Sequence, residues 1–202
     1  MAWARAHAPA AGVPDWARKA ALLVPFVVLP ASLWRIAAFT LHLPIIKDRP
    51  ADASGNLSGW LPLELYVVLL SVFSELLAFT AVGFVSTWGE VFPRWVPLLR
   101  GRRVPTLGAV IPGALGAAIL TVLWTYSLGM LALGRTMSGA ELQSGGALDL
   151  HTWQGVLAVS MYVPLVAWGP LLGAVTFAYY RRRTACRAQA DGGHDIRRPH
   201  LS

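Results

Sequence analysis

The sequence predicts an all-α polytopic membrane protein, a bundle of four transmembrane helices. Hydrophobic residues make up 55% of the 202-residue chain and charged residues only 13%, and the mean hydropathy is +0.53. A typical soluble domain contains about 25% charged residues. Four apolar stretches also reach the ~20 residues that a helix needs to cross a bilayer. These predicted spans are residues 20–41, 62–86, 107–133 and 155–180.

The four predicted spans and their short connections form one unit, residues 20–180, and leave no stretch long enough for a separate soluble domain. Residues 1–19 are expected to form an N-terminal tail, and residues 181–202 a basic C-terminal tail.

The basic residues accumulate on alternate connections. The N-terminal tail, the loop between the second and third spans and the C-terminal tail are rich in arginine, whereas the other two loops hold only Lys47, Arg49 and Arg135. The positive-inside rule therefore predicts that both termini are cytoplasmic. These arginines either set only the topology or also contact anionic lipid headgroups. The candidates for headgroup contact are Arg94, Arg100, Arg102, Arg103, Arg181, Arg182 and Arg183.

The composition also indicates where the chain resides. Arginine almost replaces lysine, and alanine, glycine, leucine and proline are abundant, which we interpret as a high-GC bacterial genome and hence a plasma membrane. The net charge of +7 follows from the topology, so no nucleic-acid partner is expected.

Several kinds of chemistry have no basis in the sequence. The single cysteine, Cys186, excludes an intramolecular disulfide and a C-x-x-C redox site. His42, His151 and Asp149 lack the spacing of a metal site, and no pair of histidines within the spans suits a haem. Phosphate-loop, nucleophile-elbow and dinucleotide motifs are also missing. We expect no metal and no other cofactor.

Three residues that are usually charged fall within the predicted spans. A rise of ~1.5 Å per residue places Glu64 about 3 Å, Arg35 about 9 Å and Glu75 about 20 Å inside the outer boundary. Because the first two spans are antiparallel neighbours, Arg35 should reach Glu64 more easily than Glu75. The sequence predicts an intramembrane Arg35–Glu64 ion pair with a structural role.

Glu75 is left near mid-membrane without an obvious cation. Ser71 and Glu75 lie on the face of the second span that also carries Glu64, so these polar groups should point inward together. A carboxyl group at this depth favours its uncharged form. In a packing role, it would donate a hydrogen bond to a backbone carbonyl or to Thr121 of the third span.

A binding role for Glu75 uses the tryptophans at similar depth, Trp34, Trp124 and Trp168. Indole faces beside a carboxylate suit an organic cation. We therefore expect the protein to bind or move a small amphiphilic or cationic molecule through a cavity around Glu75. Two alternatives stay open. The chain could be an embedded enzyme acting on an isoprenoid or other lipid, with Glu75 as the acid or as a stabiliser of developing positive charge, or a non-catalytic membrane subunit.

Gly169 and Gly173 form a G-x-x-x-G motif in the fourth span. Such spacing allows close approach of two helices. The motif therefore predicts a packing face, either within the bundle or toward a second copy or another membrane protein.

One stretch resembles a known group of proteins. Residues 88–97, WGEVFPRWVP, followed by GRRVP at residues 101–105, are similar to a pattern in small uncharacterised actinobacterial membrane proteins. The resemblance extends over the second and third spans. It implies a four-helix integral membrane protein and no particular activity.

Overall fold

The computed structural model describes residues 12–46, 62–86, 105–142 and 148–195, with side chains up to residue 185. These residues form helices and no strand; Arg135 and Glu141 form an isolated bridge, and Ser86 is a further bridge residue. The helices are α2 (Asp15–Arg35), the π-helix η1 (Ile36–Thr40), α3 (Leu63–Gly83), α4 (Thr106–Ala132), α5 (Trp153–Tyr162), the 3₁₀ segment η4 (Val163–Ala167) and α6 (Trp168–Asp195).

Four helical rods in the described residues are long and apolar enough to cross a membrane. They are Asp15–Thr40, Leu63–Gly83, Thr106–Ala132 and Trp153–Ala185, which matches the four spans predicted from the sequence. The all-α prediction is thus confirmed, and the fold suggests a multi-pass membrane protein.

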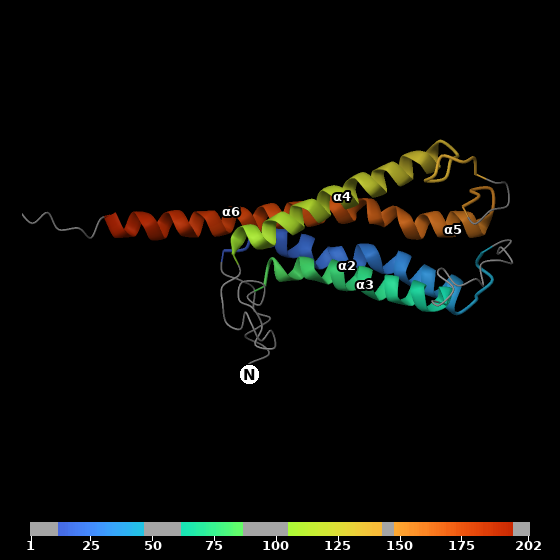
Figure 1. Cartoon of the computed structure of the whole chain (residues 1–202), viewed down its shortest axis with the longest axis horizontal. Helices are drawn as coiled ribbons and strands as arrows, with labels where there is room; N and C mark the ends of the chain where they lie inside the picture. Colours follow the sequence, from blue (N-terminus) through green and yellow to red (C-terminus); the bar gives the residue numbers. More distant parts are fainter. Residues whose placement is uncertain (1–11, 47–61, 87–104, 143–147, 196–202) are drawn as a thin grey trace, which may run out of the picture.

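The rods run antiparallel in a bundle of uneven packing (Figure 1). The α2 helix packs against both α3 and α6, and α4 packs mainly against α6 and η4. Direct contact between α3 and α4 is slight, so these two helices leave a space between them. We call the end where α2 begins the proximal end, and the end where α3 begins the distal end.

The bundle is built from small buried residues and large exposed ones. The buried face of α2 contains Ala17, Ala21 and Ala31, all fully inaccessible. By contrast, Phe26 is 68% exposed and Val122 is 69% exposed. Small residues allow helices to approach closely, and large apolar side chains facing outward suit a lipid surround. This distribution supports the membrane assignment beyond helix length alone.

Two rods contain an irregular turn. Near the distal end α2 passes into the π-helix η1, a conformation that is rare and often found at functional sites. In the fourth rod, Pro164 lies in η4, where its missing N–H is compatible with a break in the α-helical hydrogen bonding. Both irregular turns adjoin the pocket at the distal end that is described below.

The helices extend beyond the predicted spans at the proximal end. The α2 helix begins at Asp15, five residues before the predicted span, and α6 continues to Asp195, well past residue 180 (Figure 1). Hydropathy marks where apolar residues end, whereas backbone hydrogen bonding continues through polar residues that favour helix. The stretches assigned to tails from the sequence are therefore partly helical.

Candidate functional site

Glu75 and Ser71 lie on the buried side of α3. Ser71 is buried one turn before Glu75, and Ala78 is buried one turn after it. Glu75 is half-buried, and its Oε1 atom has no hydrogen-bond partner within the described part of the chain; the same holds for the Ser71 hydroxyl. Ser71 and Ala78 thus place this face of α3 inside the bundle, and α2 is the helix with which α3 makes most of its contacts.

The groups expected around Glu75 lie elsewhere. The Thr121 hydroxyl donates to the Ala117 carbonyl of its own helix at 2.7 Å, and α3 and α4 hardly touch. Glu75 lines neither of the two pockets described below. The three tryptophans are also divided, since Trp168 lines one pocket and Trp34 and Trp124 line the other.

Arg35 and Glu64 are not brought together. The Glu64 carboxylate lies 3.7 Å from the His42 imidazole, while the Arg35 guanidinium donates to the Ser32 hydroxyl at 3.3 Å. With His42 level with Glu64, Arg35 is seven residues deeper in α2, about 10 Å along the axis. The expected ion pair is absent from the described residues because α3 begins level with the end of η1.

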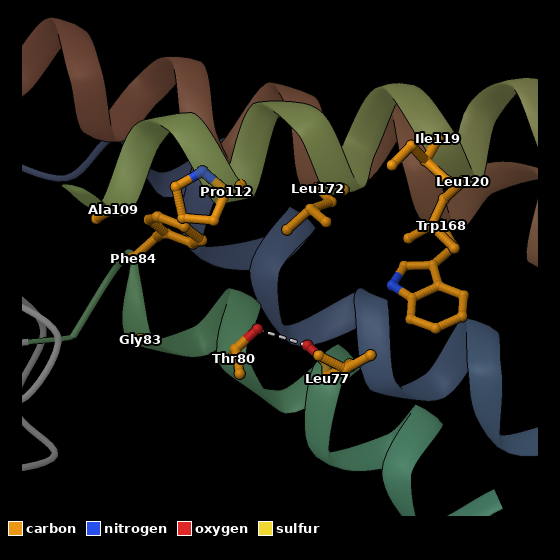
Figure 2. Close-up of a pocket in the computed structure, with 12 residues that line it drawn as sticks. Leu77, Thr80, Gly83, Phe84, Ala109, Pro112, Ile119, Leu120, Trp168 and Leu172 are labelled. Atoms are coloured by element: carbon orange, nitrogen blue, oxygen red, sulfur yellow. Dashed lines mark hydrogen bonds between the residues drawn. The ribbon is translucent and has the colours of Figure 1, made fainter. Parts of the chain in front are cut away.

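The first pocket, which we call the proximal pocket, has a volume of about 510 Å³ and lies between α3, α4 and α6. Figure 2 shows the indole of Trp168 at one end of it, with its nitrogen edge facing the space between Leu77 and Leu172. Phe84 and Pro112 lie at the other end. Thr80 is the only residue with a polar side chain beside Trp168 in its described lining, and its hydroxyl donates to the Leu77 carbonyl at 2.6 Å.

The second pocket, which we call the distal pocket, has a volume of about 370 Å³. It lies between the distal ends of α2 and α4 and the α5–η4 segment. Its described lining is mostly apolar, with aromatic rings on one side and Ser127, Arg135 and Thr136 among its polar members. The remaining lining residues are Trp34, Phe39, Trp124, Leu128, Leu131, Met137, Leu148, Val159, Tyr162, Val163 and Val166.

The aromatic side of the distal pocket is a connected set of rings. Tyr162 lies at its centre, with ring centroids 5.5 Å from Trp34 and 6.1 Å from Trp124. Phe39 of η1 packs edge-on against Trp34 at 5.9 Å. The two contacts of Trp34 are edge-to-face, an arrangement that aromatic rings favour, whereas Trp124 and Tyr162 are tilted by 44°.

Two hydrogen-bond donors of this side are unsatisfied. The indole N–H groups of Trp34 and Trp124 are buried and have no acceptor among the described residues, and Trp34 is only 7% exposed. Buried indole N–H groups usually have a partner, from the protein, a bound water or a ligand. The distal pocket therefore combines an apolar volume with donors that can bind an oxygen atom.

Two arginines give this region a positive charge. Arg135 is the one charged residue in the described lining of the distal pocket. The Arg35 guanidinium lies near the phenol of Tyr162 on the aromatic side. Such an environment is unfavourable for an organic cation and favourable for an anionic or oxygen-rich group.

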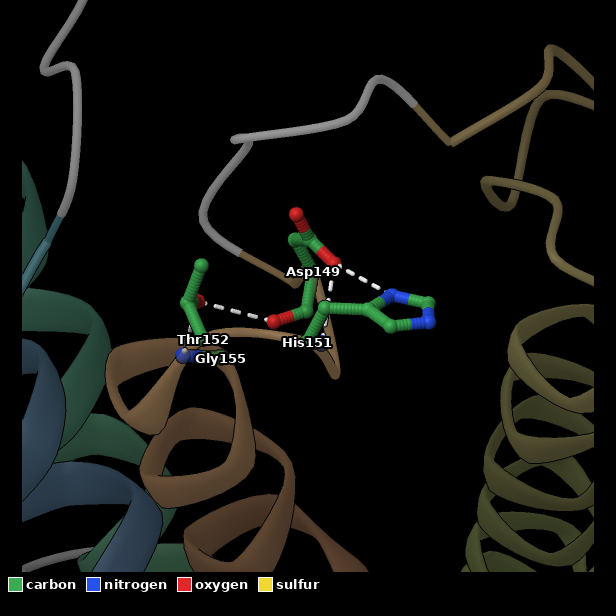
Figure 3. Close-up of polar contacts among 4 residues, drawn as sticks. All are labelled: Asp149, His151, Thr152 and Gly155. Carbon is green, nitrogen blue, oxygen red and sulfur yellow. Dashed lines mark hydrogen bonds and ion pairs between the residues drawn. The ribbon is translucent and has the colours of Figure 1, made fainter.

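The histidines considered as metal ligands have other roles (Figure 3). The Asp149 carboxylate accepts hydrogen bonds from the His151 backbone N–H at 2.9 Å, and its Oδ1 lies 3.0 Å from the His151 ring nitrogen. The Thr152 hydroxyl accepts from the Gly155 N–H at 3.2 Å and so caps α5. His42 contacts Glu64 instead, and no cluster of three metal ligands occurs in the described ranges.

The glycines of the G-x-x-x-G motif face α4 within the same chain. A Cβ atom on Gly169 would overlap Thr121 and lie 2.8 Å from the Ala117 carbonyl oxygen. A Cβ on Gly173 would contact the Ala117 side chain at 3.5 Å. The motif thus serves α4–α6 packing, and a contact with a second copy would need another face.

The arginines expected at the membrane surface are described only in part. Arg181 lies over the Phe177 ring, and Arg182 and Arg183 lie over Tyr179, all at the proximal end. Arg94, Arg100, Arg102 and Arg103 lie outside the described residues, as does most of the stretch that resembles actinobacterial proteins.

The sequence did not single out three residues that lie at or near the pockets, Tyr162, Arg135 and Tyr179. Their positions gave no signal, because Tyr162 and Tyr179 resemble ordinary aromatic residues of a span and Arg135 resembles an ordinary loop arginine. Their proximity to the tryptophans and to Arg182 depends on helix packing.

Comparisons with known proteins give no match: no family model fits the chain, and no curated protein and no solved structure is similar to it. The geometry of the pockets is therefore the basis for a functional proposal.

Proposed function

We propose that this chain is a multi-pass protein of a bacterial plasma membrane that binds a small amphiphilic molecule in the distal pocket. The observation that carries the proposal is the pair of buried indole N–H groups without a partner among the described residues, from Trp34 and Trp124, whose rings line a mostly apolar pocket. An amphiphile with an oxygen-bearing head and an apolar body matches both features. A volume of about 370 Å³ is in the range of small-molecule sites.

The charges favour an anionic or neutral head over a cationic one. Arg135 lines the pocket, Arg35 lies near Tyr162, and no acidic side chain appears in the described lining. Of the two ligand classes expected from the sequence, the amphiphile therefore suits this pocket better than the cation. The missing acid also weighs against an embedded enzyme that uses acid catalysis in this pocket.

The proposed orientation places both termini in the cytoplasm, because most arginines lie in the tails and in the loop that joins α3 to α4. The distal pocket then lies in the outer half of the bilayer. We propose that ligand enters it laterally from that leaflet, where amphiphiles accumulate.

Glu75 has a secondary place in the proposal. Its carboxyl group lies on α3 against α2, away from the lining of both pockets. Coupled movement of ligand and proton would require Glu75 to meet the ligand. The geometry thus favours binding as the main function, with Glu75 as a packing group between α2 and α3.

Photoaffinity labelling tests the site and the ligand class together. Two probes share one alkyl chain with a diazirine, and end in a carboxylate or in a trimethylammonium group. We expect the carboxylate probe to label peptides from α4 and the α5–η4 segment at the distal end. Two results would overturn the proposal: labelling confined to exposed lipid-facing residues, or stronger labelling of the distal peptides by the ammonium probe than by the carboxylate probe.

A charge variant sharpens this test. Arg135→Gln should weaken labelling by the carboxylate probe and leave labelling by a neutral monoacylglycerol probe almost unchanged, because only the first interacts with the guanidinium charge. Arg181→Gln, which removes a charge at the opposite end of the bundle, is the matched control.

A further inference from the structure

The proximal pocket ends beside a cluster of basic and aromatic residues. Phe84, at one end of the pocket, packs edge-on against Tyr179 with ring centroids 5.3 Å apart. The Arg182 guanidinium donates to the Phe84 carbonyl at 3.4 Å and lies 5.6 Å from the centre of the Tyr179 ring. Arg183 lies 5.8 Å from the same ring. The end of this apolar pocket thus adjoins Tyr179 and the two arginines that lie over its ring.

The first turn of α4 lies at the same level. A Cβ on Gly113 would touch Thr176, so these two residues lie at the same height along the axis of the antiparallel pair α4–α6. Seven residues earlier in α4 is Thr106, and seven residues later in α6 is Arg183. The N-terminus of α4 therefore lies level with the basic residues. The N–H groups of a helix N-terminus favour an anion, and no side chain of the described residues caps them here.

Two buried hydroxyl groups in this region have no partner in the described ranges. Thr106, the first residue of α4, is 3% exposed, and Tyr179 is 2% exposed; neither side-chain oxygen has a hydrogen-bond partner there. Buried hydroxyls normally form hydrogen bonds. These two groups are an observation independent of the helix terminus, and both can donate to a phosphate oxygen.

We infer that the proximal pocket and this basic cluster form a binding site for one anionic phospholipid. One acyl chain lies in the pocket and reaches toward Trp168, and the phosphate group lies among Thr106, Arg182 and Arg183. From Ala109 to Leu120, the α4 residues along the pocket span about 16 Å, which accommodates much of one acyl chain. This site is separate from the distal pocket and does not rest on the proposed function.

Quenching of Trp168 fluorescence by brominated lipids tests the inference. The full chain is reconstituted in phosphatidylcholine vesicles that contain a small fraction of acyl-brominated phosphatidylglycerol or acyl-brominated phosphatidylcholine. The difference between wild type and Trp168→Phe isolates the Trp168 signal. We expect brominated phosphatidylglycerol to quench this signal at least threefold more than the phosphatidylcholine analogue. Equal quenching would overturn the inference.

Variants separate the tail site from the headgroup site. Gly116 lines the pocket, and a Cβ there makes only an ordinary contact with Leu172 at 3.8 Å, so Gly116→Leu can fill the volume. Gly129→Leu is the matched control, because nothing lies within 4 Å of its Cβ position. Gly116→Leu should abolish the lipid preference, whereas Gly129→Leu should keep it.

Arg182→Gln should reduce the preference for phosphatidylglycerol. Arg18→Gln, which changes an exposed residue near the proximal end of α2, should not. Soluble glycerol phosphate should not displace the lipid if the acyl chain contributes to binding. Two results together would contradict the inference: glycerol phosphate displaces the lipid, and Gly116→Leu keeps the preference for phosphatidylglycerol. They would indicate a site for the phosphate group alone.

Native mass spectrometry measures retained lipid directly. It does not use the Trp168→Phe variant and so does not depend on whether that variant folds. The purified wild type and Gly129→Leu should retain one phosphatidylglycerol, and Gly116→Leu should lose it. Retention by all three proteins would overturn the inference.

Discussion

At the scale of single residues, several buried polar atoms that have no hydrogen-bond partner among the described residues lie in or near the two proposed sites. The rings of Trp34 and Trp124, which carry such donors, line the distal pocket, and the hydroxyl groups of Thr106 and Tyr179 lie at the proximal end. A buried donor that stays unpaired costs about 1–3 kcal/mol, so each of these groups favours a bound partner. The positions of these atoms are more informative than the residue types alone.

Trp34→Phe should weaken binding of the carboxylate amphiphile by about two- to tenfold, because it keeps the ring and removes one hydrogen bond worth about 0.5–1.5 kcal/mol. Trp153→Phe, at an exposed position near the start of α5, should have no effect. Competition binding with the detergent-purified protein measures both. Equal affinities for wild type and Trp34→Phe would show that the indole N–H does not contact the ligand.

Gly169→Ala should destabilise the bundle, because the added methyl group would overlap Thr121 and lie 2.8 Å from the Ala117 carbonyl oxygen. Overpacking of this kind costs about 1–3 kcal/mol. The free energy of unfolding, measured by titration with a denaturing detergent, checks the effect. Gly129→Ala, with open space around its Cβ, should be neutral or slightly stabilising. A stable Gly169→Ala protein would rule out this close α4–α6 contact.

At the scale of elements, the relative position of α2 and α3 decides which polar groups meet. Val85 belongs to the same buried cluster as Ala17, Ala20 and Ala21 at the proximal end, and His42 meets Glu64 at the distal end. This register places Arg35 level with Ser71, about one turn from Glu75. The predicted Arg35–Glu64 ion pair is not formed, because hydropathy locates the ends of a helix, and hence the register of two helices, only to within a few residues.

Cross-linking tests that register. In a Cys186→Ser background, a short thiol cross-linker should join His42→Cys to Glu64→Cys severalfold more efficiently than Arg35→Cys to Glu64→Cys, because only the first pair is level. The yield is read from gel mobility after proteolysis between α2 and α3. A preference for the Arg35 pair would restore the ion pair expected from the sequence.

At the scale of the whole molecule, the sequence predicts the number, type and approximate limits of the helices. Because a long apolar stretch in a membrane has few alternatives to a helix, the four rods could be predicted from the sequence. The pockets could not be predicted, because they depend on which helices pack together. The slight contact between α3 and α4 opens the proximal pocket, and η1 and η4 adjoin the distal one.

The proposed topology makes a prediction for the intact cell. A membrane-impermeant maleimide should label Cys186 only after permeabilisation, because α6 ends on the cytoplasmic side. Ser138→Cys in a Cys186→Ser background lies in the distal turn and should be labelled in intact spheroplasts. The reverse pattern would invert the topology and place the distal pocket in the inner leaflet.

The central claim is that the distal pocket binds an amphiphile, and the dissociation constant of a long-chain carboxylate probe tests it most directly. Val166 is a half-buried residue of the pocket lining, and Val166→Phe should fill the pocket and weaken binding at least tenfold. Val122→Phe makes the same change on the exposed side of α4 and should bind as wild type does. Equal dissociation constants for wild type, Val166→Phe and Val122→Phe would contradict the claim.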